Sequence, residues 1–289
     1  MNIFNDNDNN NTIKLYMHAG LCNQLFMIFA TISYALDNNF KYIIYSKKNI
    51  TIDNGNPVYW STFLDKLCNN ISEHIDNQIV LYEEPHFHYK KIPNITQSFN
   101  IKGYFQSDKY FKHNYEKILD IIDFRKKQQD VANEYSIFFK KKTIALHFRI
   151  GDYKGLQYNH PIMTPVYYEN ALTYLETKLK DIATDYDILY FCQKSDNETV
   201  NDYINILNKD RNYNFIKISD DIPDWKQLLL MSSCDNFIIG NSTFSWFGAY
   251  FSKNIDKLVL YPSVWFGPAL KTHDTRDICP ESWIKITAI

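Results

Sequence analysis

Hydrophobic and polar residues follow two different periods along the first part of the chain. Between residues 25 and 36 the apolar positions recur every three or four residues, which is the period of a helix with one buried face. Residues 12–17 alternate between apolar and polar positions, and residues 41–45 form a short run of tyrosine and isoleucine, as strands do. The chain is therefore predicted to begin with a strand, a loop, a helix and a second strand.

The rest of the first half contains shorter strand patterns and two helical ones. Strands are predicted at residues 78–82 and 98–101. Residues 108–122 have helical periodicity, with Asp108 as the capping residue at the amino end. The stretch 124–142 is charged and helix-prone and has no strand pattern, so we interpret it as the connection between two halves.

The second half repeats the alternation of strands and helices more regularly. Strands are predicted at residues 143–146, 187–192, 214–218, 237–239 and 258–261, and helices at 165–180, 197–207 and 223–233. Such alternation is typical of a parallel sheet covered by helices. We therefore expect an α/β fold with two Rossmann-like domains, residues 1–139 and 140–289, that face one another across a cleft.

Composition narrows the classes of protein that fit. A chain of 289 residues with 45% hydrophobic residues can form two cores of ordinary size. The net charge of -2 argues against nucleic-acid binding, which needs a clustered excess of Lys and Arg. The five cysteines are scattered and never form a CxxC pair, so neither a disulfide framework nor a zinc site is predicted.

Neither a membrane span nor a signal peptide is expected from this sequence. It contains no apolar run of about 18 residues, which a transmembrane helix requires. The amino terminus, MNIFNDNDNNN, is polar and acidic, whereas a signal peptide has a basic segment followed by an apolar one. We expect a cytoplasmic protein.

The stretch TIALHFRIGDYKG, residues 143–155, places three polar side chains after a strand that is predicted to be buried. His147, Arg149 and Asp152 follow its carboxyl end. In open α/β sheets ligands bind in the crevice at that edge, so a functional site is expected there. The alternative is structural, with Arg149 and Asp152 forming an ion pair that braces the loop and His147 buried as a hydrogen-bonded core residue.

Two other loops follow predicted strands in the same way. In HAGLCNQ, Gly20 lets the backbone approach a ligand or another domain, and Asn23 lies where a helix begins. In GNSTFSW, Asn241 or Ser242 can cap the next helix, with the Thr243 hydroxyl beside it. A helix amino terminus attracts anions such as phosphate, although an ordinary cap explains the same residues.

Five stretches resemble, in order, the motifs of family 11 glycosyltransferases, the α-1,2-fucosyltransferases. They are GLCNQLFMIFATISYA, GYFQSDKYF, HFRIGDY, NSTFSWFGAYF and PESWIKI. Together they extend from Gly20 to Ile286. Because five motifs occur in the family's order over nearly the whole chain, the resemblance is specific.

The resemblance implies a GT-B fold and an activity. The expected reaction transfers fucose, with inversion, from GDP-β-L-fucose to a galactose hydroxyl of a glycan acceptor, without a cofactor or a metal. The nearest acidic pair, Asp185 and Asp187, has an ordinary surface spacing and is not a metal site. The residues implied in GDP-fucose binding are Gly20, Asn23, Arg149, Asn241, Ser242, Thr243 and Phe244.

The implied catalytic residues are His147, Arg149 and Asp152. Without a metal the protein must stabilise the departing diphosphate, and Arg149 suits this because its charge is permanent and its donors form a fork. Asp152 or His147 is the candidate base for the acceptor hydroxyl, with Asp152 alternatively orienting Arg149 or holding the nucleotide.

The sequence departs from the family motifs in three places. Ile150 stands where the family has a second arginine, and on an extended segment it should face away from Arg149. Phe247 replaces a tryptophan, which is a conservative exchange of aromatic residues. The usual acidic segment is replaced by FCQKSDNE, residues 191–198, for which the sequence suggests no role.

Two other functions remain open on the sequence alone. One is a GT-B transferase that uses a different GDP-sugar. The other is a catalytically silent homologue that binds a nucleotide sugar or a glycan, which the loss of the second motif arginine at Ile150 would permit. The acceptor glycan and the oligomeric state are left open as well.

Overall fold

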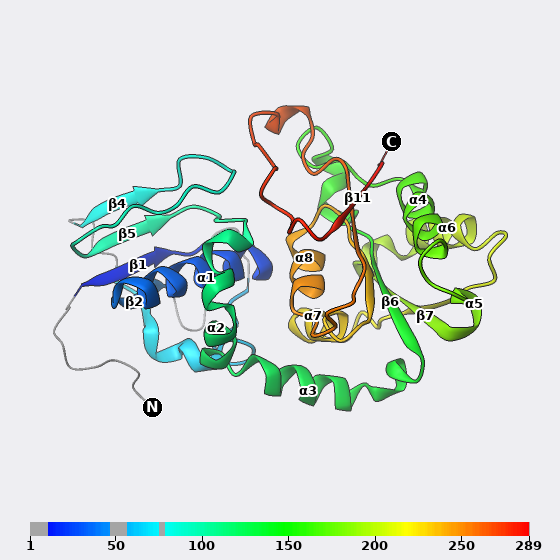
Figure 1. The fold of residues 1–289 in the computed structure, drawn as a ribbon, viewed down its shortest axis with the longest axis horizontal. Helices are drawn as coiled ribbons and strands as arrows, with labels where there is room; N and C mark the ends of the chain where they lie inside the picture. The colour runs from blue at the N-terminus through cyan, green and yellow to red at the C-terminus, as the bar shows by residue number, and fades with distance from the viewer. Residues whose placement is uncertain (1–10, 47–56, 75–78, 289) are drawn as a thin grey trace. The chain divides into compact units, whose positions relative to one another are not determined.

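The computed structural model describes residues 11–46, 57–74 and 79–288. The chain divides into two compact units. The N-terminal unit comprises Met1–Arg125 and His273–Cys279, and the C-terminal unit comprises Lys126–Thr272 and Pro280–Ile289. Each unit contains one parallel sheet with helices (Figure 1), as the alternating pattern predicts.

The sheet of the N-terminal unit has the strand order β3-β2-β1-β5-β4. Its strands are β1 (Thr12–Tyr16), β2 (Lys41–Tyr45), β3 (Ile71–Ser72), β4 (Val80–Glu83) and β5 (Phe99–Lys102). All neighbouring pairs are parallel, and Leu15 of the central strand lies opposite both Ile44 and Ile101. The predicted strand at 78–82 begins in a segment outside the described residues.

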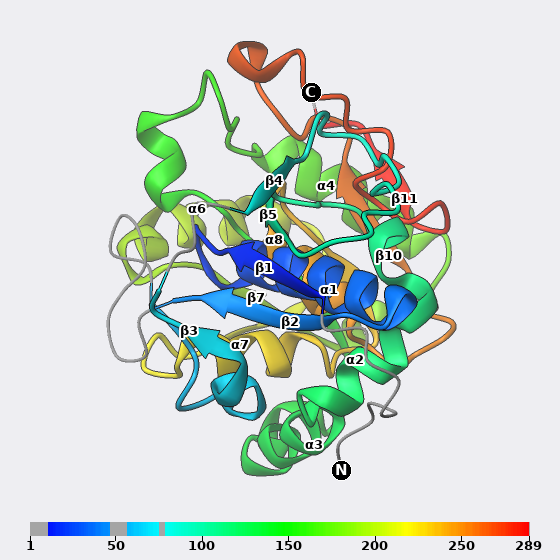
Figure 2. The ribbon, with the colours of Figure 1, turned by 90° about the vertical axis from the view of Figure 1, so that its left-hand side faces the viewer.

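Helix α1 (Leu21–Asn38) lies against β1 and β2, as Figure 2 shows. Its apolar face is fully buried, and it ends at Asn39 in the left-handed conformation, whose N–H donates to the Ala35 carbonyl. The Phe29 ring meets Phe111 edge to face at 5.3 Å. This contact ties the helix to the segment after β5.

The prediction of one helix over residues 108–122 is wrong for the first half of that range. Two 3-10 turns, Asp108–Tyr110 and Lys112–Asn114, precede a short helix α2 (Tyr115–Ile121). The capping residue is Ser107, whose hydroxyl accepts from the Lys109 N–H at 3.4 Å. The chain breaks at Phe111, whose backbone is not helical and whose ring is buried against α1. Burial of that ring outweighs the local preference for one continuous helix.

The sheet of the C-terminal unit has the strand order β11-β10-β9-β6-β7-β8, and all its neighbouring pairs are parallel. Its strands are β6 (Lys142–His147), β7 (Tyr186–Phe191), β8 (Asn214–Lys217), β9 (Asn236–Ile238), β10 (Val259–Pro262) and β11 (Ile284–Ile286). The helices are α3 (Phe124–Glu134), α4 (Pro165–Glu176), α5 (Ile182–Asp185), α6 (Asn197–Leu207), α7 (Asp224–Met231) and α8 (Thr243–Tyr250). After β6, the next two strands, β7 and β8, are added on one side of β6, and the following strand, β9, is added on its other side. The topological switch point of this sheet therefore lies between β6 and β9.

The core of the C-terminal unit is formed by the strands and by helices α4 and α6. Ile144 and Leu146 of β6 pack with Phe148 and with Ile150, which is 2% exposed. The prediction that Ile150 faces away from Arg149 is confirmed, because its side chain packs into this core. The side chain at this position belongs to the core and not to the polar edge of the sheet.

The boundary between the units lies at Arg125, earlier than residue 139, where the sequence placed it. Gln128 of α3 donates its buried amide N–H to the Ser232 hydroxyl at 2.9 Å and to the Ser232 carbonyl at 3.2 Å. Glu134 accepts two hydrogen bonds from Lys226. Because these partners lie about 100 residues further along the chain, the charged stretch is part of the second unit and not a linker.

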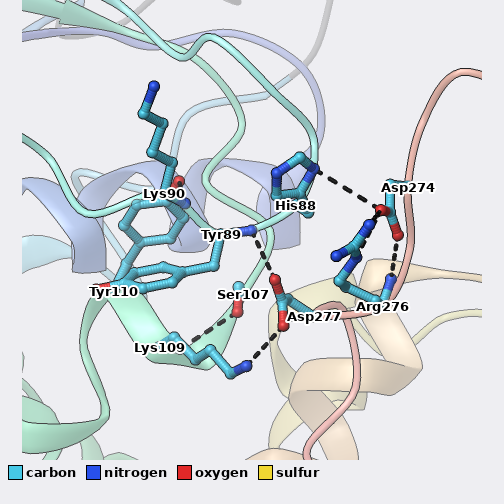
Figure 3. A network of polar contacts seen from close by, with 9 residues as sticks. All are labelled: His88, Tyr89, Lys90, Ser107, Lys109, Tyr110, Asp274, Arg276 and Asp277. Atoms are coloured by element: carbon cyan, nitrogen blue, oxygen red, sulfur yellow. Dashed lines mark hydrogen bonds and ion pairs between the residues drawn. The ribbon is translucent and has the colours of Figure 1, made fainter.

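The segment His273–Cys279 returns to the N-terminal unit near the end of the chain (Figure 3). Asp277 pairs with Lys109 at 2.6 Å and accepts from the Tyr89 N–H at 3.1 Å. The Phe87 ring lies 5.3 Å from His273. Lys109 belongs to the GYFQSDKYF stretch, so one role of that motif is to hold this returning segment.

Candidate functional site

The carboxyl ends of β6 and β9 meet at the switch point of the C-terminal sheet. Leu146 pairs with Ile238, and the HFRIGDY and GNSTFSW stretches follow these strands directly. A Cβ atom at Gly240 would lie 3.4 Å from the His147 carbonyl oxygen and 3.7 Å from Cβ of Arg149. The two motif loops are therefore in close contact.

His147 is buried beneath this contact. Its Nδ1 lies 3.0 Å from the Ser245 hydroxyl, and its ring lies 5.5 Å from the Phe244 ring. Because Ser245 donates to the Ser242 carbonyl, its oxygen is free to accept from Nδ1–H. Burial, with a contribution from the charge of Arg149, lowers the pKa of His147 from 6.5 to about 3. His147 is therefore a neutral imidazole that supports the start of α8.

Arg149 lies at the edge of the site and pairs with Asp152. Its Nη2 is 2.8 Å from Oδ1 and 2.9 Å from Oδ2 of the carboxylate. The side chains are 26% and 54% exposed, so the pair contributes little stability. The expected ion pair is present, and its carboxylate can be exchanged for another anion at low cost. The geometry is thus compatible with both a structural and a functional role.

A residue that the sequence did not suggest holds the turn between Arg149 and Asp152. Asp196 is fully buried, and its Oδ2 accepts from the Gly151 N–H at 2.7 Å. Its Oδ1 lies 3.1 Å from Nζ of Lys154. A Cβ at position 151 would lie 1.6 Å from Oε1 of Gln193, so a side chain there would require the end of the Gln193 side chain to move. The FCQKSDNE segment therefore has a role as the support of the HFRIGDY turn.

The sequence position of Asp196 does predict a role for this residue, but a different one from the role seen in the structure. Its place directly before α6 predicts an ordinary helix cap. In the structure its side chain makes no capping hydrogen bond to α6 and turns to Gly151 instead. Only the folded sheet, which brings the ends of β6 and β7 together, shows this contact.

The GNSTFSW loop presents the amino terminus of α8. Of the two candidate caps, Ser242 is the one used, since its hydroxyl accepts from the Phe244 N–H at 3.3 Å. Asn241 is 2% exposed and donates its amide N–H to the carbonyls of Pro161 and Trp265. Its Oδ1 has no hydrogen-bond partner within the described part of the chain. A buried acceptor without a partner is costly, and it is typical of a site that a ligand or water completes.

The structure thus gathers most of the expected site residues in one unit. His147, Arg149, Asp152, Asn241, Ser242, Thr243 and Phe244 all belong to the C-terminal unit, at or beside the switch point. Gly20 and Asn23 belong to the N-terminal unit.

In the N-terminal unit the HAGLCNQ loop also follows a switch-point strand, because β1 lies between β2 and β5. Asn23 Oδ1 accepts from the Gln106 amide at 2.9 Å, which joins this loop to the GYFQSDKYF stretch. Ala19 carries the left-handed backbone with φ of 63°, a strained conformation for alanine. Gln24 holds it by donating to the Ala19 carbonyl at 2.9 Å.

Within the described ranges, no three His, Cys, Asp or Glu side chains gather as a metal-binding group. Of the helices in those ranges, none combines the length and the apolarity that a bilayer span requires.

The five motifs agree with a comparison of the sequence against known families. The model of Glycosyl transferase family 11 matches residues 7–287. The chain belongs to this family. The resemblance stated from the motifs is therefore confirmed.

Two curated relatives are both from Escherichia coli. The O-antigen biosynthesis glycosyltransferase WbnK is 28% identical over 200 residues, which is 66% of this chain and 62% of WbnK. An alpha-1,2-colitosyltransferase is 26% identical over 213 residues, which is 71% of this chain and 68% of that protein. The match to WbnK thus spans less than two thirds of that relative.

The solved structures found by comparison have low sequence identity to this chain and TM-scores below 0.5. A mutant of Arabidopsis thaliana FUT1 in complex with GDP is 10% identical, with a TM-score of 0.49, and the match covers 96% of this chain and 77% of that one. NodZ alpha-1,6-fucosyltransferase from Bradyrhizobium, co-crystallized with GDP, is 11% identical, with a TM-score of 0.47. The match covers 85% of this chain and 93% of NodZ. The E. coli ADP-heptose LPS heptosyltransferase II is 10% identical with a TM-score of 0.49, covering 96% and 90%.

Proposed function

We propose that this glycosyltransferase moves L-fucose from GDP-β-L-fucose to a galactose hydroxyl of a glycan and forms an α-1,2 linkage. The observation that carries the proposal is the arrangement at the switch point of the C-terminal sheet. There Arg149, an exchangeable cation, adjoins the loop that carries Asn241 and the amino terminus of α8. Such a place suits a nucleoside diphosphate.

The diphosphate of the donor would be neutralised by this chain's own groups. Arg149 would exchange the Asp152 carboxylate for phosphate oxygens, which its planar fork can contact with two hydrogen bonds. The Thr243 amide at the start of α8 would supply a neutral donor. No metal or cofactor is needed in this scheme.

The reaction would be a direct displacement at the anomeric carbon. The acceptor oxygen forms the new bond to that carbon while the bond to the β-phosphate breaks, and GDP leaves with the electron pair. The transition state has oxocarbenium character, so Arg149 acts on charge that grows on the departing diphosphate.

The proton of the acceptor hydroxyl would pass to a base. Of the two candidates, Asp152 is the better placed, because it is exposed and is released when Arg149 turns to phosphate. His147 is buried, its pKa is lowered to about 3, and Nδ1 is engaged with Ser245. We therefore assign His147 to holding the start of α8.

A second candidate is a transferase that uses another GDP-sugar, and colitose is favoured among these. The supporting observation is the alpha-1,2-colitosyltransferase relative. Colitose is L-fucose without its 3-hydroxyl group, so one site could accept either sugar. The silent homologue is less favoured. Ile150, which stands in place of the second motif arginine, packs into the core, and the first motif arginine, Arg149, is still present at the site.

A donor panel tests the proposal. The purified protein is incubated with GDP-fucose, GDP-colitose, GDP-mannose or UDP-galactose, with and without an acceptor that ends in galactose, and with EDTA or added magnesium. The expected result is acceptor-dependent release of GDP from GDP-fucose, unaffected by EDTA, with an α-1,2 product by NMR. Turnover with GDP-colitose alone would select the second candidate. Binding without turnover would select the silent homologue, and loss of activity on chelation would overturn the metal-free scheme.

A further inference from the structure

Tyr153 lies between the two motif loops of the C-terminal unit. The guanidinium carbon of Arg149 lies 5.1 Å from the centre of the Tyr153 ring. The Tyr153 hydroxyl donates to the main-chain carbonyl of Asn241 at 3.1 Å. One side chain therefore contacts the arginine of the first loop and the backbone of the second.

The ring is fixed by further packing. His160 stacks on Tyr153, with centroids 4.9 Å apart and ring planes 23° apart, and Phe266 meets His160 at 5.5 Å. The amide of Asn241 donates to the carbonyls of Pro161 and Trp265, which are the sequence neighbours of His160 and Phe266. The ring is thus held by the His160 stack and by the hydrogen bond of its hydroxyl, and it cannot turn away from Arg149 without breaking these contacts.

The charges around Tyr153 suit a lasting contact with Arg149. Burial is the larger influence and raises the pKa of the Tyr153 phenol, while Arg149 opposes this shift. The hydroxyl therefore remains a donor to Asn241 at neutral pH. The aromatic face attracts the guanidinium independently of the exposed Asp152 carboxylate.

We propose that Tyr153 is a positioning residue that holds the Arg149 guanidinium beside the start of α8, ready for an anionic diphosphate. When Arg149 exchanges Asp152 for phosphate, the ion pair is lost and the ring contact remains. The long arginine side chain then loses less conformational freedom on binding, because the ring has already restricted it. This inference rests on the proposed binding of a GDP-sugar in the C-terminal unit.

The test uses the intact protein and GDP as the probe in titration calorimetry. Tyr153→Phe removes only the hydroxyl and should weaken GDP binding about three- to tenfold, the scale of one hydrogen bond. Tyr153→Leu also removes the aromatic face and should weaken it about tenfold or more. In an Arg149→Ala background either change should alter the affinity less than about twofold, because Tyr153 acts through Arg149.

A matched control comes from the N-terminal unit. The Tyr34 hydroxyl donates to the Pro93 carbonyl at 3.1 Å, the same kind of bond at the same distance. Tyr34→Phe should lower the melting temperature and leave GDP affinity unchanged.

The outcomes separate this inference from the function on which it rests. If Tyr153→Phe and Tyr153→Leu weaken GDP binding by the same factors in the Arg149→Ala background as in the wild-type protein, Tyr153 does not act through Arg149 and the inference is overturned. If the wild-type protein binds no GDP, the proposed function fails. The inference is then decided by denaturant unfolding of the ligand-free variants, in which strictly additive effects of Arg149→Ala and Tyr153→Leu would overturn it.

Discussion

Arg149 forms an ion pair with Asp152, whose carboxylate is accessible to water. The Arg149 side chain is partly exposed and that of Asp152 is more than half exposed, so breaking the pair costs about 0.2–1 kcal/mol. A cation held this loosely by its carboxylate, yet supported by the Tyr153 ring, is suited to take up a charged ligand. The consequence is that substitution should affect catalysis much more than folding.

Arg149→Ala should lower the rate of sugar transfer by at least about two orders of magnitude, the scale of losing one preorganised donor. Arg149→Lys keeps the charge but loses the fork, so its rate should lie between those of the wild type and the alanine variant. The melting temperature should change little in both. Transfer rates and melting are measured on the same preparations. Near wild-type transfer together with much lower melting in Arg149→Ala would favour the purely structural ion pair.

His147 should make the stability of the protein depend on pH. Burial lowers its pKa from 6.5 to about 3, so between these values the unfolded chain binds one more proton than the folded one. Stability is therefore lost as the pH falls from 6.5 towards 3. One pKa unit corresponds to about 1.4 kcal/mol, so roughly 2 kcal/mol should be lost between pH 6.5 and pH 5.

The measurement is urea unfolding at pH 7.5 and pH 5 for the wild type and His147→Gln. The variant cannot take up the proton and should lose about 2 kcal/mol less over this range. If both proteins respond to pH equally, the imidazole is not held neutral in the folded state.

At the scale of elements, the turn from β7 to α6 decides the conformation of the turn after β6. Asp196 reaches 45 residues back along the chain to the Gly151 N–H. Such a contact depends on β6 and β7 being neighbours in the sheet, and local preference alone would have made Asp196 a helix cap. The support of the Arg149 loop is therefore a property of the sheet.

Asp196→Ala leaves the Gly151 N–H without its partner and should cost about 1–3 kcal/mol of unfolding free energy. Because the turn carries Arg149, the KM for the donor should also rise about tenfold or more, and Asp196→Asn, which keeps an acceptor oxygen, should recover part of both losses. Unfolding and steady-state kinetics give the two readouts.

Asp187, at the other end of β7, provides a matched control. It is also a buried carboxylate and accepts from the Asn214 amide at 2.8 Å. Asp187→Ala, matched to Asp196→Ala, should reduce stability and leave the donor KM unchanged. A donor KM that rises equally in both variants would show that Asp196 acts only through overall stability.

At the scale of the whole molecule, the two units are not two uninterrupted halves of the chain. Helix α3 belongs largely to the C-terminal unit through Gln128, and His273–Cys279 belongs to the N-terminal unit through Asp277. Neither assignment follows from local pattern, because Gln128 meets Ser232 and Asp277 meets Lys109 across more than 100 residues. The true unit boundary changes which fragment is expected to fold.

A fragment of residues 126–289 should therefore be more stable than one of residues 140–289. The shorter fragment loses the buried hydrogen bonds of Gln128 to Ser232 and the pair of Glu134 with Lys226. The hydrogen bonds of Gln128 should contribute about 1–3 kcal/mol to the free energy of unfolding, and the exposed pair of Glu134 with Lys226 should contribute less. The check is thermal melting of both fragments, with GDP binding by calorimetry. Equal melting temperatures would place α3 outside the C-terminal unit.

The sequence by itself determined the parts of this protein that depend on contiguous residues. Periodicity located β2 (Lys41–Tyr45) and α6 (Asn197–Leu207) to the residue, since each element's own side chains create its buried face. The ordered motifs likewise identified the family and placed Arg149 beside a strand end. Only the tertiary structure decided which distant groups meet, such as Asp196 with Gly151 and Tyr153 with Asn241. These contacts depend on strand order and on the burial of particular rings, which local hydrophobic pattern does not encode.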